Sequence, residues 1–246
     1  MKQQGASRAL FNKNQFNATS DLLNQIERAT TDTIILNRIK PLGKLAKAYA
    51  LWDVFQHHKA FQIIKRLERD ELNRNKRFLG QLFRATEPEP YYIADLLNNA
   101  KRRGSDEKKF DDAVARLYRT IELIAQYTLK REYNIDVSNV SPDQIPTQLL
   151  QKWNMPPEKP RILLALEKDY EILAAMNHLL GQRFAQDMEL KDLLNKRNTS
   201  ILAHNLIPVD QKTYRKIFQK AIEYATSTIR NLNQLIDDST FIKWTD

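Results

Sequence analysis

The chain has 246 residues, 42% of them apolar and 28% charged, which is enough for one large or two small domains with a real core. It has no cysteine, which excludes disulfides, cysteine-ligated metals and cysteine nucleophiles. The net charge of +9 fits a polyanionic partner or simply a basic soluble protein. Its five glycines form no nucleotide-binding motif, which argues against an ATP or NAD enzyme. Without a signal sequence or an apolar run of membrane-spanning length, we expect a cytoplasmic protein with no membrane partner.

The first hundred residues contain a faint internal repeat. Ala9-Leu10-Phe11-Asn12 recurs 41 residues later as Ala50-Leu51-Trp52-Asp53, and a second apolar stretch follows each copy. A period of this length is typical of stacked helical hairpins, although two copies are equally compatible with chance similarity between helices. We therefore predict a helical-hairpin region over residues 1–105. Its boundary is placed where prolines and the charged run KRRGSDEKK interrupt the pattern.

Amphipathic helices continue in the second half of the chain. Apolar residues recur at helical spacing from Phe110 to Leu129, with Asp106 as the expected cap, and again from Tyr214 to Leu235, with Asp210 as the cap. Residues 162–180 are apolar on more than one side, which predicts one buried central helix. Because no segment alternates with period two, the predicted fold class is all-α.

Three histidines are interpreted as structural. We expect His57 and His58 in a solvated turn between two helices, and His178 in a hydrogen-bonded position inside an apolar helix. No spacing of His, Asp and Glu typical of metal ligands is present, so neither a metal nor another cofactor is predicted.

Chemistry is most strongly indicated in residues 188–207, which we predict to be a helix capped by Asp187. Leu190, Arg197 and His204 follow at intervals of seven residues, so they share one helical face. An arginine and a histidine thus stand in line with leucines, where a buried polar group needs a partner. The spacing alone leaves two interpretations: Arg197 pairs with a buried carboxylate while His204 caps the helix, or the two residues are functional.

A family resemblance favours the functional interpretation. Arg197-Asn198, followed after five residues by His204, resembles the signature of HEPN ribonucleases. The stretches AYALWDVFQHHKAFQII, FDDAVARLYRTIELIAQYTL and RNTSILAHN resemble, in this order, the helical region and the nuclease domain of CRISPR-associated CARF–HEPN proteins. The resemblance implies a HEPN helical bundle over residues 106–246. It also implies a metal-independent endoribonuclease that acts in antiviral defence.

The resemblance further implies a role for each motif residue. Single-stranded RNA carries its own nucleophile, the 2′-hydroxyl, so the protein must stabilise charge on the phosphate and move protons. Arg197 suits the first task and His204 the second, while Asn198 would orient the phosphate or the histidine. The expected products are a 2′,3′-cyclic phosphate and a 5′-hydroxyl. Two copies of the helix would face each other in a homodimer with a composite site.

Basic residues surround the motif. Residues 196–231 contain seven lysines and arginines against two acidic residues. From this group we expect four residues to bind RNA: Lys196, Lys212, Arg215 and Lys216. On the predicted helix before the motif, Arg116 and Glu122 are expected to join an ion-pair network and to support the catalytic residues.

The sequence departs from the family in one respect. CARF–HEPN proteins begin with a Rossmann-like sensor of cyclic oligoadenylate, and no such region is present here, so we expect the sensor to be a separate protein or to have been removed. The alternative function is a non-catalytic helical RNA-binding or adaptor module with a degenerate HEPN domain. Having both Arg197 and His204 favours the enzyme. A third possibility, a helical scaffold for a protein partner, fits the basic C-terminal half less well.

Overall fold

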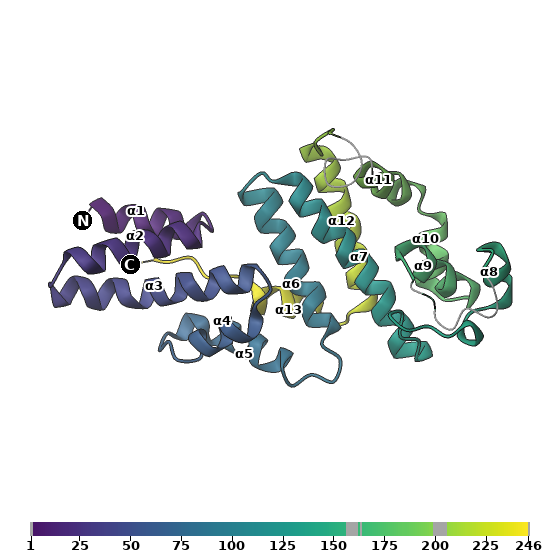
Figure 1. The fold of residues 1–246 in the computed structure, drawn as a ribbon, viewed down its shortest axis with the longest axis horizontal. Coiled ribbons are helices and arrows are strands. Elements are labelled where there is room, and N and C mark those ends of the chain that lie inside the picture. The colour runs from purple at the N-terminus through teal and green to yellow at the C-terminus, as the bar shows by residue number, and fades with distance from the viewer. Residues whose placement is uncertain (1, 156–161, 163, 199–205, 246) are drawn as a thin grey trace. The chain divides into compact units, whose positions relative to one another are not determined.

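The computed structural model of the protein describes residues 2–155, 162, 164–198 and 206–245. Within these residues the backbone forms thirteen α-helices with short 3-10 and π-helical segments (Figure 1). Val140 and Ile162 form an isolated β-bridge. The predicted all-α fold class is therefore confirmed. No helix in this described part is long and apolar enough to cross a membrane.

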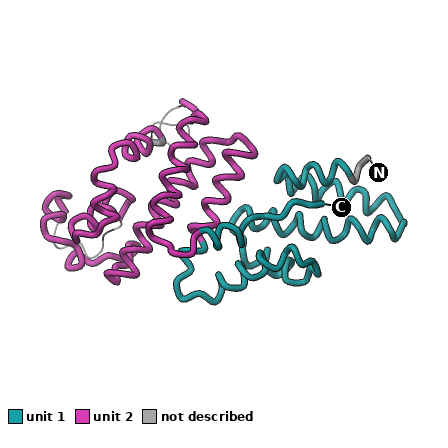
Figure 2. Tube along the Cα trace, turned by 180° about the vertical axis from the view of Figure 1, so that it is seen from behind, with its two compact units in different colours: residues 1–91, 233–246 teal, residues 92–232 magenta. Residues whose placement is uncertain are grey.

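The helices form two compact units (Figure 2). Unit 1 comprises residues 1–91 and 233–246, and unit 2 comprises residues 92–232. The domain boundary predicted near residue 105 lies inside unit 2, within a π-helical segment, Arg102–Asp106.

Unit 1 is a series of helices in which consecutive members pack against one another. Its helices are α1 (Lys2–Asn12), α2 (Phe16–Ala29), α3 (Thr33–Asp53), α4 (His57–Ile64), α5 (Asn73–Leu82) and most of α13 (Leu232–Ser239), with a 3-10 turn at Asp70–Leu72. Asp32 begins the longest of them, α3, by accepting a hydrogen bond from the Ile34 amide at 2.8 Å. The N-terminal region is thus built of helical hairpins, as predicted.

The two copies of the sequence repeat form the same corner between helices. In each copy the residue before the glutamine that starts the second helix has a left-handed backbone: Asn14 at φ 62° and Phe55 at φ 59°. The amides of Gln15 and Gln56 each donate to the carbonyl five residues earlier, at 2.9 Å. The faint 41-residue repeat of the sequence is therefore also a repeat of backbone conformation.

Aromatic side chains and the C-terminal segment form the core of unit 1. Phe241 stacks on Tyr49 with 4.1 Å between the ring centroids, and Trp52 meets Phe241 edge-on at 5.1 Å. The Tyr49 hydroxyl donates to Asn75 Oδ1 at 2.6 Å and accepts from the Ile242 amide at 3.1 Å. The segment after α13 thereby completes the core that the first five helices begin.

Unit 2 is arranged around its longest helix. Its elements are the greater part of α6 (Glu89–Lys101), α7 (Phe110–Tyr133), α8 (Thr147–Lys152), α9 (Leu166–Ala175), α10 (Leu179–Gln186), α11 (Met188–Asn198) and α12 (Gln211–Thr228). Helices α9, α11 and α12 all contact α7, and α12 runs alongside it (Figure 1). Tyr170 on α9 donates to the Ile121 carbonyl of α7 at 2.9 Å and stacks on Phe184 of α10 at 4.1 Å.

The predicted single helix over residues 162–180 is wrong. Helix α9 ends at Ala175, Asn177 takes a left-handed backbone with φ 58°, and a new helix begins after His178. The segment is apolar on several sides because α9 and α10 pack against each other as well as against the rest of the unit.

Two further predicted boundaries are revised. Asp106 does not cap α7, which begins after Lys109, because Asp106 belongs to the preceding π-helical segment. The apolar stripe from Tyr214 to Leu235 is shared by two helices, since α12 ends at Thr228. The predicted cap of α12 is confirmed: Asp210 accepts from the Thr213 amide at 2.6 Å.

Candidate functional site

The predicted catalytic residues lie at the end of α11 and beyond it. Arg197 and Asn198 are the last two residues of the helix, but their side chains lie outside the described residues, as does the whole of His204. Leu206 and Ile207 are not helical, so the predicted helix over 188–207 is too long. That Arg197 and His204 share one face stays a prediction.

Helix α11 is fixed by a row of buried leucines. Leu190 is fully buried, and Leu193 and Leu194 are each 4% exposed. The backbone position of Arg197 comes one helical turn after these two, in the row that the leucines begin. The structure therefore agrees with the predicted leucine face of this helix as far as the backbone of Arg197.

Asp187 holds the start of α11 and joins it to α12. Its carboxylate accepts hydrogen bonds from the Leu190 amide at 3.0 Å, from Lys220 Nζ at 2.9 Å and from the Tyr224 hydroxyl at 3.3 Å. Burial alone would raise the pKa of Asp187, but the bonds from Lys220 and Leu190 outweigh burial and hold the pKa below its usual value. The capping role predicted for Asp187 is confirmed.

The chain on the far side of the motif is anchored to the start of α7. The Val209 amide donates to both carboxylate oxygens of Asp111, at 3.1 and 3.3 Å. Val209 is nearly buried, whereas Leu206 and Ile207 are 86% and 67% exposed. The sequence analysis missed this role of Asp111, whose one available signal was an acidic residue in the first turn of a long helix.

The predicted RNA-binding residues are exposed and lie on two neighbouring elements. Lys212, Arg215 and Lys216 follow at helical spacing on one side of α12. The amide of Thr213 lowers the pKa of Asp210, and the nearby positive charges of Lys196 and Lys212 lower it further. The end of α11 and the start of α12 therefore bring basic side chains together around Asp210.

Lys216 is paired with an acidic residue of the neighbouring helix. Lys216 Nζ lies 2.8 Å from Glu189 Oε1, which adds an exposed ion pair between α12 and α11. Both side chains of this ion pair are about half exposed to solvent, so the pair contributes little to stability.

The ion-pair network predicted on α7 is confirmed. Arg116 bonds the Asn99 side chain and lies 3.2 Å from the Asp112 carboxylate, while Glu122 pairs with Arg119 at 2.6 Å. Support of the catalytic residues by Arg116 or Glu122 stays a prediction.

The other histidines have structural surroundings. His57 and His58 both lie in the first turn of α4, so the expected inter-helix turn is wrong for both. His57 is buried beside the Trp52 ring, whereas His58 is exposed to solvent as expected. His178 is partnered as predicted, but it caps α10 instead of lying inside a helix: its Nδ1 accepts from the Leu180 amide, and its Nε2 lies 3.0 Å from Glu132. Among the described residues, no group of three His, Asp or Glu side chains could hold a metal ion.

Comparison with known families adds the decisive observation. Residues 81–228 match the Csm6 HEPN domain, and residues 2–89 match the Csm6 6H domain. The first match alone covers more than half of the chain. The chain belongs to the Csm6 HEPN family. No CARF domain is among these matches, and no curated protein matches the chain.

The Csm6 HEPN match contains every residue proposed for the site, from Arg116 on α7 to Lys216 on α12. It confirms the resemblance to CRISPR-associated HEPN proteins that the sequence suggested, and it supports a CRISPR-associated HEPN ribonuclease. The Csm6 6H match covers the five helices that begin unit 1.

Proposed function

We propose that the chain is a metal-independent endoribonuclease that cleaves single-stranded RNA in the cytoplasm, in CRISPR-linked antiviral defence. One observation carries the proposal: the motif Arg197-Asn198 and His204 lies within residues 81–228, the segment that matches the Csm6 HEPN domain. The structure on either side of the motif supports the proposal. Asp187 caps the helix that leads into the motif, and Asp111 accepts a hydrogen bond from the Val209 amide, which follows it.

The proposed reaction uses only groups of the RNA and of the chain. His204 takes or gives the proton as the 2′-hydroxyl attacks the adjacent phosphorus and the 5′-oxygen leaves. Arg197 stabilises the negative charge that develops on the phosphate, since a guanidinium is always charged and can bind two phosphate oxygens at once. Asn198 orients the phosphate or the imidazole.

Exposed cations beside the motif would hold the RNA strand. Lys196 and Lys212 lie near Asp210, and Arg215 extends the same side of α12. Such a group raises the local concentration of a polyanion and makes its binding dependent on salt. Lys216 would take part to the extent that its pair with Glu189 opens.

The test is cleavage of single-stranded RNA in excess EDTA by the parent chain, His204→Ala, Arg197→Ala and the control His58→Ala. His58 is an exposed histidine outside the HEPN match. Loss of the proton-transfer group should lower the rate by about 10²–10⁴-fold, while His58→Ala cuts at the parent rate. The products should end in a 2′,3′-cyclic phosphate.

Two outcomes would contradict the proposal. Activity abolished by chelation and restored by Mg²⁺ or Mn²⁺ would replace the metal-independent mechanism. A parent chain that binds RNA without cutting it would be the non-catalytic RNA-binding module.

A further inference from the structure

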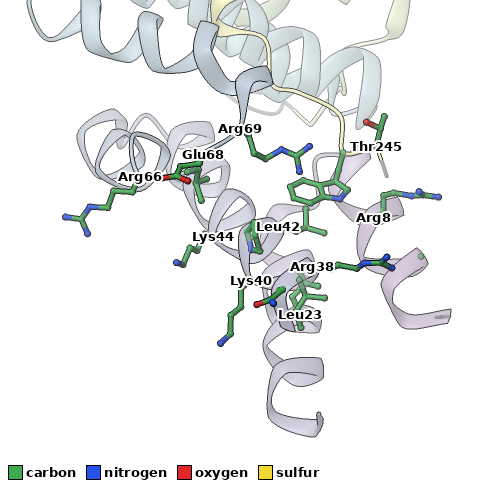
Figure 3. A pocket seen from close by; sticks show the side chains of 16 residues that line it. Arg8, Leu23, Arg38, Lys40, Leu42, Lys44, Arg66, Glu68, Arg69 and Thr245 are labelled. Atoms are coloured by element: carbon green, nitrogen blue, oxygen red, sulfur yellow. The ribbon is translucent and has the colours of Figure 1, made fainter. Parts of the chain in front are cut away.

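Unit 1 contains a pocket of about 1040 Å³ whose walls are strongly basic (Figure 3). Helix α1, helix α3, the loop that follows α4 and the end of the C-terminal segment all contribute to its lining. Its charged lining residues are Arg8, Arg38, Lys40, Lys44, Arg66 and Arg69 against Glu68. Six cations around one concave surface create a positive potential that favours an anion.

Half of these cations have no polar partner within the described part of the chain. Arg38, Lys44 and Arg66 make no side-chain hydrogen bond or ion pair with any residue that the structure describes. By contrast, Lys40 lies 3.6 Å from Glu27, and Arg69 lies 3.2 Å from Glu71. The protein thus neutralises part of the basic lining and leaves three charges available to a ligand.

An aromatic ring forms part of the same wall. The Arg69 guanidinium lies over Trp244, with 4.1 Å from its central carbon to the ring centroid. The tryptophan is held in place by Asn12, which accepts from its amide at 2.7 Å and donates to its carbonyl at 3.1 Å. A fixed aromatic ring beside arginines is the combination that proteins use to bind single-stranded nucleic acid.

We propose that this pocket binds the phosphodiester backbone of single-stranded RNA, as a second contact in addition to Lys212, Arg215 and Lys216 on α12. The inference rests on the proposed function, because it takes the same ligand. The basic side chains are spread around the pocket and do not meet at one point (Figure 3), which suits several phosphates of a strand. Arg38 and Arg66, on separate elements, can each bind phosphate oxygens with two parallel hydrogen bonds.

The experiment measures binding of a fluorescent 2′-O-methyl RNA 12-mer to the whole chain by anisotropy. This RNA lacks the attacking hydroxyl, so binding is measured whether or not the chain is a nuclease. The pocket variant combines Arg38→Gln, Lys44→Gln and Arg66→Gln. The matched control combines Lys13→Gln, Arg28→Gln and Lys59→Gln, three exposed cations of unit 1 outside the pocket.

The pocket variant should bind at least about 10-fold more weakly than the parent at roughly 0.1 M salt. Its slope of log affinity against log salt should be shallower by about 2, since each phosphate contact on a single strand contributes about 0.7. The control should differ little from the parent in either quantity.

Three results would overturn the inference. These are equal affinities for the pocket variant and the control, displacement of the 12-mer by polyglutamate as readily as by unlabelled RNA, and competition by a dinucleotide as strong as that by the 12-mer. The last two would assign the pocket to an acidic protein segment or to a small nucleotide.

The failure of this inference and the failure of the proposed function give different results. If the pocket variant binds RNA as tightly as the parent and the parent cuts RNA, only the pocket proposal is refuted. If binding depends on the pocket but the parent does not cut ordinary RNA, only the proposed enzyme is refuted.

Discussion

Asp169 is a carboxylic acid enclosed between α7 and α9 in the core of unit 2. Its side chain is fully buried; Gln126 donates to one oxygen at 3.4 Å, and the other has no hydrogen-bond partner among the described residues. The pKa of Asp169 is raised to about 7, mainly by burial and also by the charge of Glu122, while the hydrogen bond from Gln126 and the charge of Arg119 oppose the rise. The folded protein therefore retains a proton there that the unfolded chain releases at lower pH.

Stability should consequently fall as pH rises. Between about pH 4 and pH 7 the folded state binds the extra proton, so the free energy of unfolding decreases through this window, at up to about 1.4 kcal/mol per pH unit from this group. Asp169→Asn keeps the shape without the charge and should be more stable than the parent above pH 7. Denaturant titrations from pH 4 to 8 measure the difference. The exposed Asp192→Asn serves as control, and parallel curves for parent and Asp169→Asn would refute the argument.

Gly104 is required by a close approach within unit 2. A Cβ atom added there would overlap the ring of Tyr214, whose hydroxyl lies 3.1 Å from Ser105 Oγ. Gly104→Ala should lower the free energy of unfolding by about 1–3 kcal/mol, the usual cost of overpacking. Gly43→Ala is the matched control, because its Cβ would meet Leu23 at an ordinary 3.8 Å inside a helix that alanine favours. Equal stability of the two variants in thermal or urea unfolding would remove the role given to Gly104.

At the scale of elements, the position of the motif helix depends on one capping residue. Asp187 accepts from the amide of Leu190 in α11 and from Lys220 and Tyr224 in α12. Asp187→Ala should cost about 1–3 kcal/mol, since it removes a cap and leaves a partly buried lysine without its main partner.

The same variant should lower RNA cleavage under conditions in which it is fully folded, because α11 carries Arg197. Asp192→Ala, an exposed position on the same helix, provides the comparison. A variant that loses stability but cuts at the parent rate would show that the cap does not position the motif.

Sequence periodicity predicted the helices of this protein better than the places where they break. The stripe from Phe110 to Leu129 became α7 because one apolar side faces one core. The prediction of a single helix over residues 162–180 was wrong because a segment that is apolar on several sides is compatible with one buried helix and also with two helices packed on each other. The decisive feature, a left-handed residue at Asn177, leaves no periodic signal.

The candidate site shows the same division. Capping by Asp187 could be predicted because the residues that it bonds lie within one turn of the chain. The bond from Val209 to Asp111 could not, because the two are 98 residues apart and meet only through tertiary packing. The function of the motif is predicted from family resemblance, because helical spacing alone leaves both interpretations of Arg197 and His204 open.

At the scale of the whole molecule, the chain passes from unit 1 into unit 2 along α6 and returns to unit 1 in α13 (Figure 2). The HEPN match lies mainly in the inserted unit, and the 6H match lies in the unit that the C-terminal segment completes. Two exposed apolar residues, Leu206 and Ile207, lie two and three positions after the last motif residue, His204. We predict that they are covered by a second copy of the chain in a homodimer.

A homodimer would also complete the chemistry, because one Arg–His pair can contact the scissile phosphate from one side only, and a two-fold axis beside α11 would bring a second pair opposite. Ile207→Asp should then abolish cleavage and yield a monomer in sedimentation. Leu179→Asp, at a residue 80% exposed elsewhere in unit 2, should do neither.

Mixing Arg197→Ala with His204→Ala protomers should restore part of the activity that each lacks alone, since one site of the mixed dimer can use residues from both chains. A parent chain that sediments as a monomer while fully active at nanomolar concentration would exclude the shared site.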